Sequence, residues 1–151
     1  MENIKTLEQI KRPWVVAHRG YRGSYPENTL VAFEAAIGVN ADMIELDVSL
    51  TRDRIPVVIH DNTLDRTTNG SGPVSEHTLA ELKELDAGSW FSAKFSGEVI
   101  PTLEELLMSV KGRITVNIEI KPESFESPAI PDGIESQICE LVEKLEMGDS
   151  V

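Results

Sequence analysis

The stretch MIELDVSL, residues 43–50, carries both the fold signal and the chemistry of this chain. Its positions 44, 46 and 48 are apolar, whereas Glu45 and Asp47 between them are acidic. A period of two is typical of a β-strand, in which successive side chains point to opposite faces. We therefore expect Glu45 and Asp47 to point together from one face of a strand whose other face is buried.

A second stretch, ITVNIEI at residues 114–120, shows a related alternation. Asn117, Glu119 and Lys121 fall on one face, and apolar residues at 116, 118 and 120 oppose them. The strands of parallel α/β sheets are covered on both faces, so inward carboxylates are costly unless a charge compensates them.

Three carboxylates on converging strands therefore predict a cation site formed by Glu45, Asp47 and Glu119. Oxygen-only ligands suit Mg²⁺ or Ca²⁺ better than zinc. The alternative is a set of exposed charges on an amphipathic sheet edge, without a bound ion.

Two histidines also stand at the ends of apolar runs. His18 and Arg19 follow the run at 14–17, and His60 closes the run at 55–60. Imidazole transfers protons near neutral pH, and a guanidinium is suited to phosphate oxygens. With a cation and Lys121 nearby, these groups indicate phosphoester cleavage, with one histidine as base and the other as acid. A strand-end histidine can also be purely structural, and His77, in polar sequence, is interpreted as solvated surface.

The remaining pattern alternates between strands and helices, which favours parallel α/β architecture. Residues 51–54 are short enough for a hairpin, residues 61–100 form a polar excursion, and residues 122–131 read as a loop. Strands are predicted at 14–17, 43–50, 55–60 and 114–120, and helices at 30–39, 78–85, 101–110 and 133–146.

Composition limits the function classes. The chain has 151 residues, enough for one domain with a real core, and a formal net charge of −12 that disfavours nucleic-acid binding. No apolar run reaches the roughly 18–20 residues of a transmembrane helix, and residues 1–14 lack a signal-peptide centre. Because Cys139 is the single cysteine, no intrachain disulfide is possible, and we expect a cytoplasmic protein.

Several short strings, taken in order, resemble the glycerophosphodiester phosphodiesterases. The resemblance covers residues 14–122 and becomes specific through the order of its strings rather than through any one of them. The strings are HRG at 18–20, PENT at 26–29, ELD at 45–47, HD at 60–61, DRTT at 65–68, LDAGSWF at 85–91 and IEIK at 118–121.

This resemblance implies a (β/α)₈ barrel with an insertion after the second strand, matching residues 61–100. It implies hydrolysis of glycerophosphodiesters to sn-glycerol 3-phosphate and an alcohol, through attack of the substrate's own glycerol hydroxyl on phosphorus. The implied roles are a divalent metal, Mg²⁺ or Ca²⁺, at the three carboxylates, phosphate contacts from Arg19 and Lys121, and acid/base catalysis by His18 and His60.

For the string PENT, we expect a role in shaping the first loop and capping the first helix, with substrate contact by Glu27 or Asn28 as the lesser alternative. Trp90 and Phe91 are expected to be buried under the insertion rather than to line the glycerol side of the site.

The length departs from the family pattern, because such a barrel typically needs ~250 residues. We expect residues 1–151 to form the N-terminal portion of one domain, with about three β/α units and the insertion at about 61–100. Two alternatives stay open. One is a catalytically incomplete half-barrel that self-associates through its open edge, and the other is a sphingomyelinase-type phospholipase with the same half-site.

Overall fold

Strand β2 (Met43–Leu50) is the centre of a four-stranded sheet in the computed structural model, which describes residues 12–121 and 132–151. Strand β1 (Val16–His18) pairs with it in parallel, and so does β4 (Thr115–Ile120). Strand β3 (Pro56–Val58) pairs with it antiparallel, as the predicted hairpin requires. The parallel α/β interpretation is confirmed for these residues.

The register shows how the strands share the two edges of β2. Met43 to Glu45 pair with both β1 and β4, and Val48 pairs with both Val58 and Ile120. Because a strand has two edges, β4 occupies one of them, and β1 and β3 follow one another along the other.

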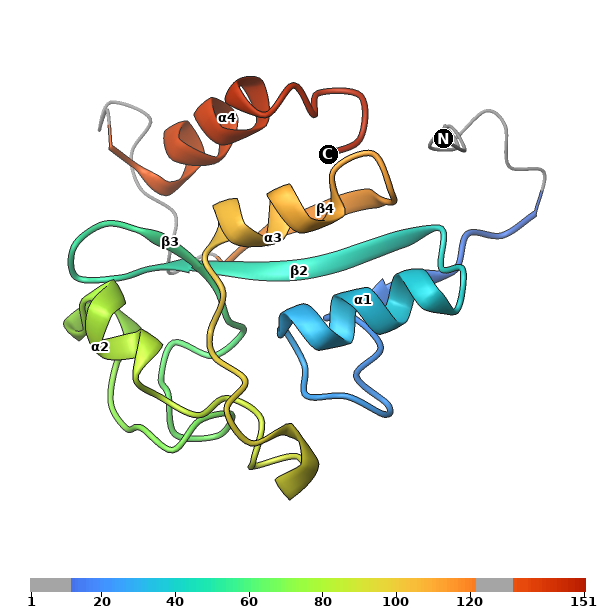
Figure 1. The fold of residues 1–151 in the computed structure, drawn as a ribbon. Helices are drawn as coiled ribbons and strands as arrows, with labels where there is room; N and C mark the ends of the chain where they lie inside the picture. Colours follow the sequence, from blue (N-terminus) through green and yellow to red (C-terminus); the bar gives the residue numbers. More distant parts are fainter. Residues whose placement is uncertain (1–11, 122–131) are drawn as a thin grey trace.

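The helices follow the strands in the predicted order (Figure 1). Every predicted helix is present, and two short 3₁₀ helices in the excursion add to the prediction. The helical segments are α1 (Leu30–Gly38), η2 (Val74–Glu76), α2 (Leu79–Lys83), η3 (Ala93–Phe95), α3 (Leu103–Val110) and α4 (Ile134–Lys144). The predicted loop at 122–131 lies outside the described residues. No described helix is long and apolar enough to span a membrane.

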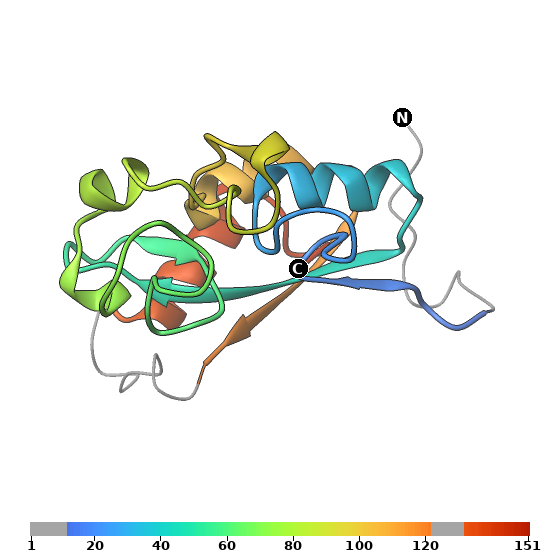
Figure 2. The same ribbon diagram turned by 90° about the horizontal axis from the view of Figure 1, so that it is seen from below.

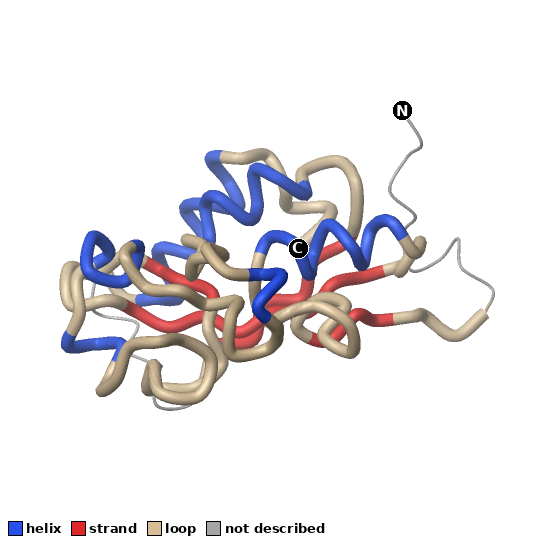
Figure 3. The backbone as a smooth tube through the Cα atoms, turned by 60° about the horizontal axis from the view of Figure 1, so that its bottom comes forward, coloured by secondary structure: helices blue, strands red, loops and turns tan. Residues whose placement is uncertain are grey.

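One hydrophobic cluster, which we call the sheet core, joins the even-numbered face of β2 to α1, α3 and α4. Figure 3 shows the long helical segments gathered on one side of the strands. The helices thus cover one face of the sheet, and Glu45 and Asp47 project from the other. The buried members of the sheet core are Phe33, Ala36, Ile44, Leu46, Val48, Val58, Leu103, Leu106, Leu107, Val110, Ile114, Val116, Ile134, Ile138 and Met147.

The segment 61–100 has a second and smaller cluster, the insertion core. In Figures 1 and 2 this segment, green to yellow, gathers around β3 and α2. Because apolar side chains hold it together, the excursion is a folded insertion rather than an extended loop. The buried members are Val57, Ile59, Leu64, Val74, Leu82, Ala87 and Ile100.

Two of the four described α-helices, α2 and α3, begin with a capping box. Thr78 and Thr102 each form a capping box, in which the threonine accepts from the amide of Glu81 or Glu105 and the glutamate accepts from the threonine amide. For α1, Thr29 occupies the N-cap position, but its hydroxyl donates to the Pro26 carbonyl at 2.7 Å. Thr29 is thus the N-cap residue, as predicted, but its side chain does not cap a helix amide.

Candidate active site

The three predicted carboxylates meet where β2 and β4 run side by side. Asp47 and Glu119 are register partners, and one oxygen each of Glu45, Asp47 and Glu119 lies within 4.8 Å of the other two. Glu45 and Asp47 are buried, whereas the Glu119 side chain is 46% exposed. The structure therefore brings the three residues together, with two of them buried and the third at the rim.

Asp47 is compensated by side chains from three segments. Lys121 Nζ lies 2.8 Å from its Oδ1, Arg19 Nε lies 3.3 Å from its Oδ2, and Asn28 Nδ2 donates to Oδ2 at 3.1 Å. Burial alone would raise the pKa of Asp47, but the hydrogen bonds from Lys121 and Asn28 outweigh it and hold the pKa below its usual value. Asp47 is therefore an anion at neutral pH.

Lys121 also contacts Glu119, with Nζ 2.6 Å from Oε1. Burial acts to lower the pKa of Lys121, but the two carboxylates outweigh it and raise that pKa, so the ammonium stays charged. One lysine thus bridges two of the three acidic residues.

Glu45 is the least compensated member of the cluster. Its Oε2 accepts from the Arg19 amide at 3.1 Å, but its buried Oε1 has no hydrogen-bond partner among the described residues. Burial, together with Asp47 and Glu119, raises the pKa of Glu45. A buried acceptor without a donor, next to two further carboxylates, is where an added cation would be stabilised.

The donor set fits a hard divalent cation. Oxygens that share one Ca²⁺ at about 2.4 Å are at most about 4.8 Å apart, and the three oxygens of the cluster lie within 4.8 Å of one another. An ion here would share Asp47 and Glu119 with Lys121. Glu45, Asp47 and Glu119 could thus hold a metal whose identity the geometry leaves open.

Arg19 reaches the cluster through an unusual turn. Arg19 and Gly20 have φ values of +58° and +78°, and a Cβ on Gly20 would lie 2.8 Å from Ala32. Left-handed backbone is costly for arginine, so the surrounding contacts must hold it. The Arg19 amide donates to the Glu45 carbonyl at 2.8 Å, and its carbonyl accepts from the Asn28 amide at 3.1 Å.

The two predicted catalytic histidines stand on different segments, His18 at the end of β1 and His60 just after β3. His18 ends β1, with Nε2 3.6 Å from Glu45 Oε2 and its side chain 45% exposed. Burial, Arg19 and Arg22 lower the pKa of His18. His60 follows Ile59, whose amide donates to the Asp47 carbonyl at 3.0 Å, so the hairpin returns His60 to the middle of β2.

The third histidine lies apart from the site. His77 is partly buried, its Nδ1 lies 2.8 Å from the Pro73 carbonyl, and its own carbonyl accepts from the Arg52 amide. The interpretation of His77 as solvated surface is therefore wrong, although no catalytic residue contacts it among those described.

The contacts that several polar residues make at the site were not predicted. Asn28 holds Asp47, and Glu27 accepts from Arg19 Nη1 at 3.1 Å and from Arg66 Nη2 at 2.7 Å. Arg66 also binds Asp61, the residue after His60. The strings PENT, HD and DRTT contain all four residues, but no periodicity in them indicates mutual contact.

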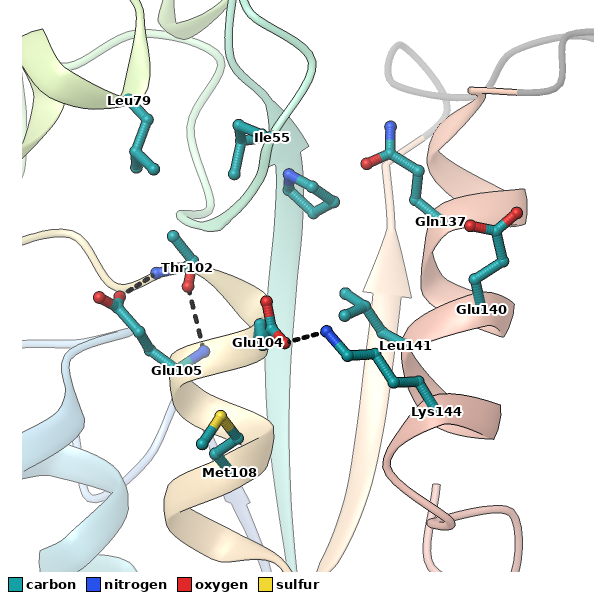
Figure 4. A pocket seen from close by; sticks show the side chains of 11 residues that line it. Ile55, Leu79, Thr102, Glu104, Glu105, Met108, Gln137, Glu140, Leu141 and Lys144 are labelled. Carbon is teal, nitrogen blue, oxygen red and sulfur yellow. Dashed lines mark hydrogen bonds and ion pairs between the residues drawn. The ribbon is translucent and has the colours of Figure 1, made fainter.

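One cavity lies away from these residues. It has a volume of about 590 Å³ and is lined by parts of α2, α3, α4 and the turn before β3 (Figure 4). Its polar side chains include Glu104, which pairs with Lys144 at 2.6 Å. None of the predicted site residues lines it.

Comparison with known sequences identifies proteins that are related to this chain. Residues 18–146 match the model of the glycerophosphoryl diester phosphodiesterase family. The putative glycerophosphodiester phosphodiesterase YhdW of Bacillus subtilis is 51% identical over 129 residues, 85% of this chain and 51% of that protein. A glycerophosphodiester phosphodiesterase of Caldanaerobacter subterraneus is 47% identical over 138 residues, 91% of this chain and 55% of that protein.

Solved structures agree with the sequence matches. A glycerophosphodiester phosphodiesterase from Agrobacterium tumefaciens matches with a TM-score of 0.82 and 41% identity, over 92% of this chain and 56% of that one. A phosphodiesterase from Oleispira antarctica, solved with the product sn-glycerol-3-phosphate, matches with a TM-score of 0.77 and 39% identity, over 87% and 52%. The chain spans about half the length of the relatives it matches.

Proposed function

The chain belongs to the glycerophosphoryl diester phosphodiesterase family, and we propose that it carries the catalytic residues for metal-dependent hydrolysis of glycerophosphodiesters to sn-glycerol 3-phosphate and an alcohol. The observation that carries this proposal is the carboxylate cluster on β2 and β4, with Arg19 and Lys121 beside it. Family membership favours this activity over that of a sphingomyelinase-type phospholipase.

In this proposal, Glu45, Asp47 and Glu119 hold Mg²⁺ or Ca²⁺. The bound ion supplies charge stabilisation for phosphate oxygens as the phosphoester is cleaved. Arg19 and Lys121 bind the same phosphate, because both are cations within contact of Asp47. They orient the diester and offset the negative charge that would otherwise repel it.

His18 and His60 move the protons. One takes the proton from the attacking hydroxyl of the substrate, and the other gives a proton to the leaving alcohol. The cyclic phosphate formed in this way is then opened by water. Support comes from the positions of the two histidines. His18 Nε2 lies near Glu45 Oε2, and His60 follows Ile59, whose amide donates to the Asp47 carbonyl.

We further propose that residues 1–151 are the N-terminal portion of one (β/α)₈ barrel domain, with the insertion at about 61–100. Strands β1, β2 and β4 would be its first three strands, and the carboxylate-bearing face would line its interior. Two observations support this: the strands are parallel with helices on one face, and the relatives are about twice as long. The single cysteine fits a cytoplasmic enzyme.

The proposal is tested by metal binding and turnover in the same preparation. Calorimetric titration with Mg²⁺ and Ca²⁺ should show binding that Glu45→Gln weakens by about 10-fold or more, since a ligand is lost. Hydrolysis of a glycerophosphodiester should stop on chelation and in His18→Ala or His60→Ala.

Glu143→Gln is the matched control, because Glu143 is exposed on α4, which packs against the opposite face of the sheet. Equal metal affinity in Glu45→Gln and Glu143→Gln would contradict the assigned ligands. Turnover that survives both histidine substitutions would contradict the assigned catalysts.

One observation favours a second candidate, a non-enzymatic half-barrel that assembles with a copy of itself. Among the described residues, β4 pairs with β2 alone, which leaves its other edge without a strand partner. Such an edge favours association. Light scattering that shows dimers, in a chain without metal binding or turnover, would support this candidate over the enzyme.

A further inference from the structure

His60 and its neighbour Asp61 form a close pair at the start of the insertion. Nδ1 of His60 lies 2.5 Å from Oδ1 of Asp61, and both side chains are about three-quarters buried, with 29% and 26% exposed. A carboxylate this close decides which ring nitrogen carries a proton.

Asp61 in turn accepts two hydrogen bonds from Arg66. Arg66 Nε donates to Oδ2 at 2.6 Å, and Nη2 donates to Oδ1 at 3.0 Å, which is the two-point geometry of a guanidinium on a carboxylate. The hydrogen bond from Arg66 is the main reason that the pKa of Asp61 falls to about 2. An ionised carboxylate only accepts hydrogen bonds, so the hydrogen between the pair belongs to Nδ1 of His60.

Arg66 also connects this pair to the carboxylate cluster. Its Nη2 donates to Glu27 at 2.7 Å, Glu27 accepts from Arg19 at 3.1 Å, and Arg19 lies 3.3 Å from Asp47. The path joins the insertion, the first loop and β2. A shift of the insertion would therefore change both the histidine and the phosphate-binding arginine.

Stabilisation alone is a weak explanation for these contacts. The Arg66 side chain is 44% exposed, and solvated ion pairs contribute little to stability. His77, in the same insertion, offers a contrast, because its Nδ1 faces the Pro73 backbone carbonyl rather than a carboxylate.

We propose that Asp61, clamped by Arg66, is a positioning residue that keeps the proton of neutral His60 on Nδ1 and leaves Nε2 as the nitrogen that exchanges protons with the substrate. The inference rests on the proposed function for the role of His60. It adds the identity of the reacting nitrogen and the two residues that select it.

The test is the tautomer of His60 in the chain labelled with ¹⁵N-histidine, observed in long-range ¹H–¹⁵N spectra at about pH 9, where imidazole is neutral. The wild-type ring should show a protonated Nδ1 and an unprotonated Nε2. Asp61→Ala should shift His60 towards the tautomer mixture of free imidazole, and Arg66→Gln should do so to a smaller extent.

Two controls separate positioning from folding. The His77 signals should stay unchanged in each variant, which reports an intact insertion. Asp65→Asn is the matched variant, because Asp65 lies in the same segment but accepts from the Gly72 amide. It should leave the His60 tautomer as in the wild type.

A wild-type His60 protonated on Nε2, or an unchanged tautomer in Asp61→Ala, would overturn the inference. In a preparation that hydrolyses a glycerophosphodiester, Asp61→Ala should lower kcat about 100-fold with little change in KM, as expected for impaired proton transfer. If the preparation hydrolyses the glycerophosphodiester but His60 is protonated on Nε2, only the inference is contradicted. If His60 is protonated on Nδ1 but no hydrolysis occurs, only the proposed function is contradicted.

Discussion

The sheet core and the insertion core differ in how they are built, and each supports a different part of the site. The sheet core draws its side chains from strands β2, β3 and β4 and from three helices, whereas the insertion core relies on short elements such as the five-residue α2. Val57 and Val58 are adjacent in β3, yet Val57 belongs to the insertion core and Val58 to the sheet core. β3 thus joins the two regions.

This difference has a consequence for the site. The carboxylates stand on β2 and β4, which the sheet core holds, while His60, Asp61 and Arg66 depend on the insertion. A region with fewer buried apolar contacts opens more easily. We therefore expect the part of the site that holds His60 to open before the part that holds the carboxylates.

The largest effect is expected in the sheet core. Phe33 is fully buried between α1 and the sheet, so Phe33→Ala should lower the free energy of unfolding by about 3–5 kcal/mol through lost burial and a cavity. Urea unfolding followed by circular dichroism measures this. Val39→Ala, at a position 58% exposed just after α1, is the control and should cost under about 0.5 kcal/mol. Similar losses in the two variants would contradict the assigned core.

The next effect separates the two cores. Leu82 is fully buried in the insertion core, and Leu82→Ala should lower the local opening free energy there by about 2–4 kcal/mol. Amide hydrogen exchange should accelerate in α2 and its surroundings while the amides of β2 stay protected. Leu107→Ala, in the sheet core, should instead expose the β2 amides. Equal acceleration in β2 from both variants would show that the two cores unfold as one unit.

The two capping boxes offer a smaller and matched comparison. Thr78 begins α2 and Thr102 begins α3, with the same pattern of bonds. Thr78→Ala and Thr102→Ala should each cost about 1 kcal/mol, because a helix amide loses its acceptor. Exchange rates should place the first loss in the insertion and the second in the sheet core. Serine at either position keeps the hydroxyl and should restore most of the stability, and failure to do so would argue against capping as the cause.

The smallest effect is a pH dependence confined to the insertion. Because the pKa of Asp61 is lowered to about 2 when folded, its ionised form stabilises the fold above the unfolded pKa, and this contribution is lost as pH falls from about 4 through about 2. Solvent screening limits the contribution to roughly 1 kcal/mol. The stability difference between the wild type and Asp61→Asn should therefore shrink over this range in urea titrations. In an Arg66→Gln background the difference should be smaller above about pH 4, where Asp61 is ionised, and an unchanged difference there would contradict the role of Arg66.

Residues on regular elements were predicted well. The two-residue period of 43–50 identified β2, its buried face and the shared direction of Glu45 and Asp47, because side-chain alternation follows from backbone geometry alone. The parallel neighbour β4 then placed Glu119 beside Asp47 through register.

Residues on irregular segments were predicted only in part. Arg19 was predicted to contact phosphate, which stays a prediction, and its left-handed turn and its contact with Asp47 follow from no sequence period. Thr29 is of a residue type that is common at helix N-caps, but its hydroxyl donates to the Pro26 carbonyl instead of accepting from a helix amide.

The sequence by itself determined the order of the elements, the two faces of each strand and the acidic and basic groups available for chemistry. Only the tertiary structure decided which cation neutralises which carboxylate. One example is Arg66, which contacts both Asp61 and Glu27, although Glu27 lies 39 residues away in the sequence. The physical reason is range: periodicity arises from neighbouring residues on one backbone, whereas an ion pair between two loops depends on how the cores beneath them pack together.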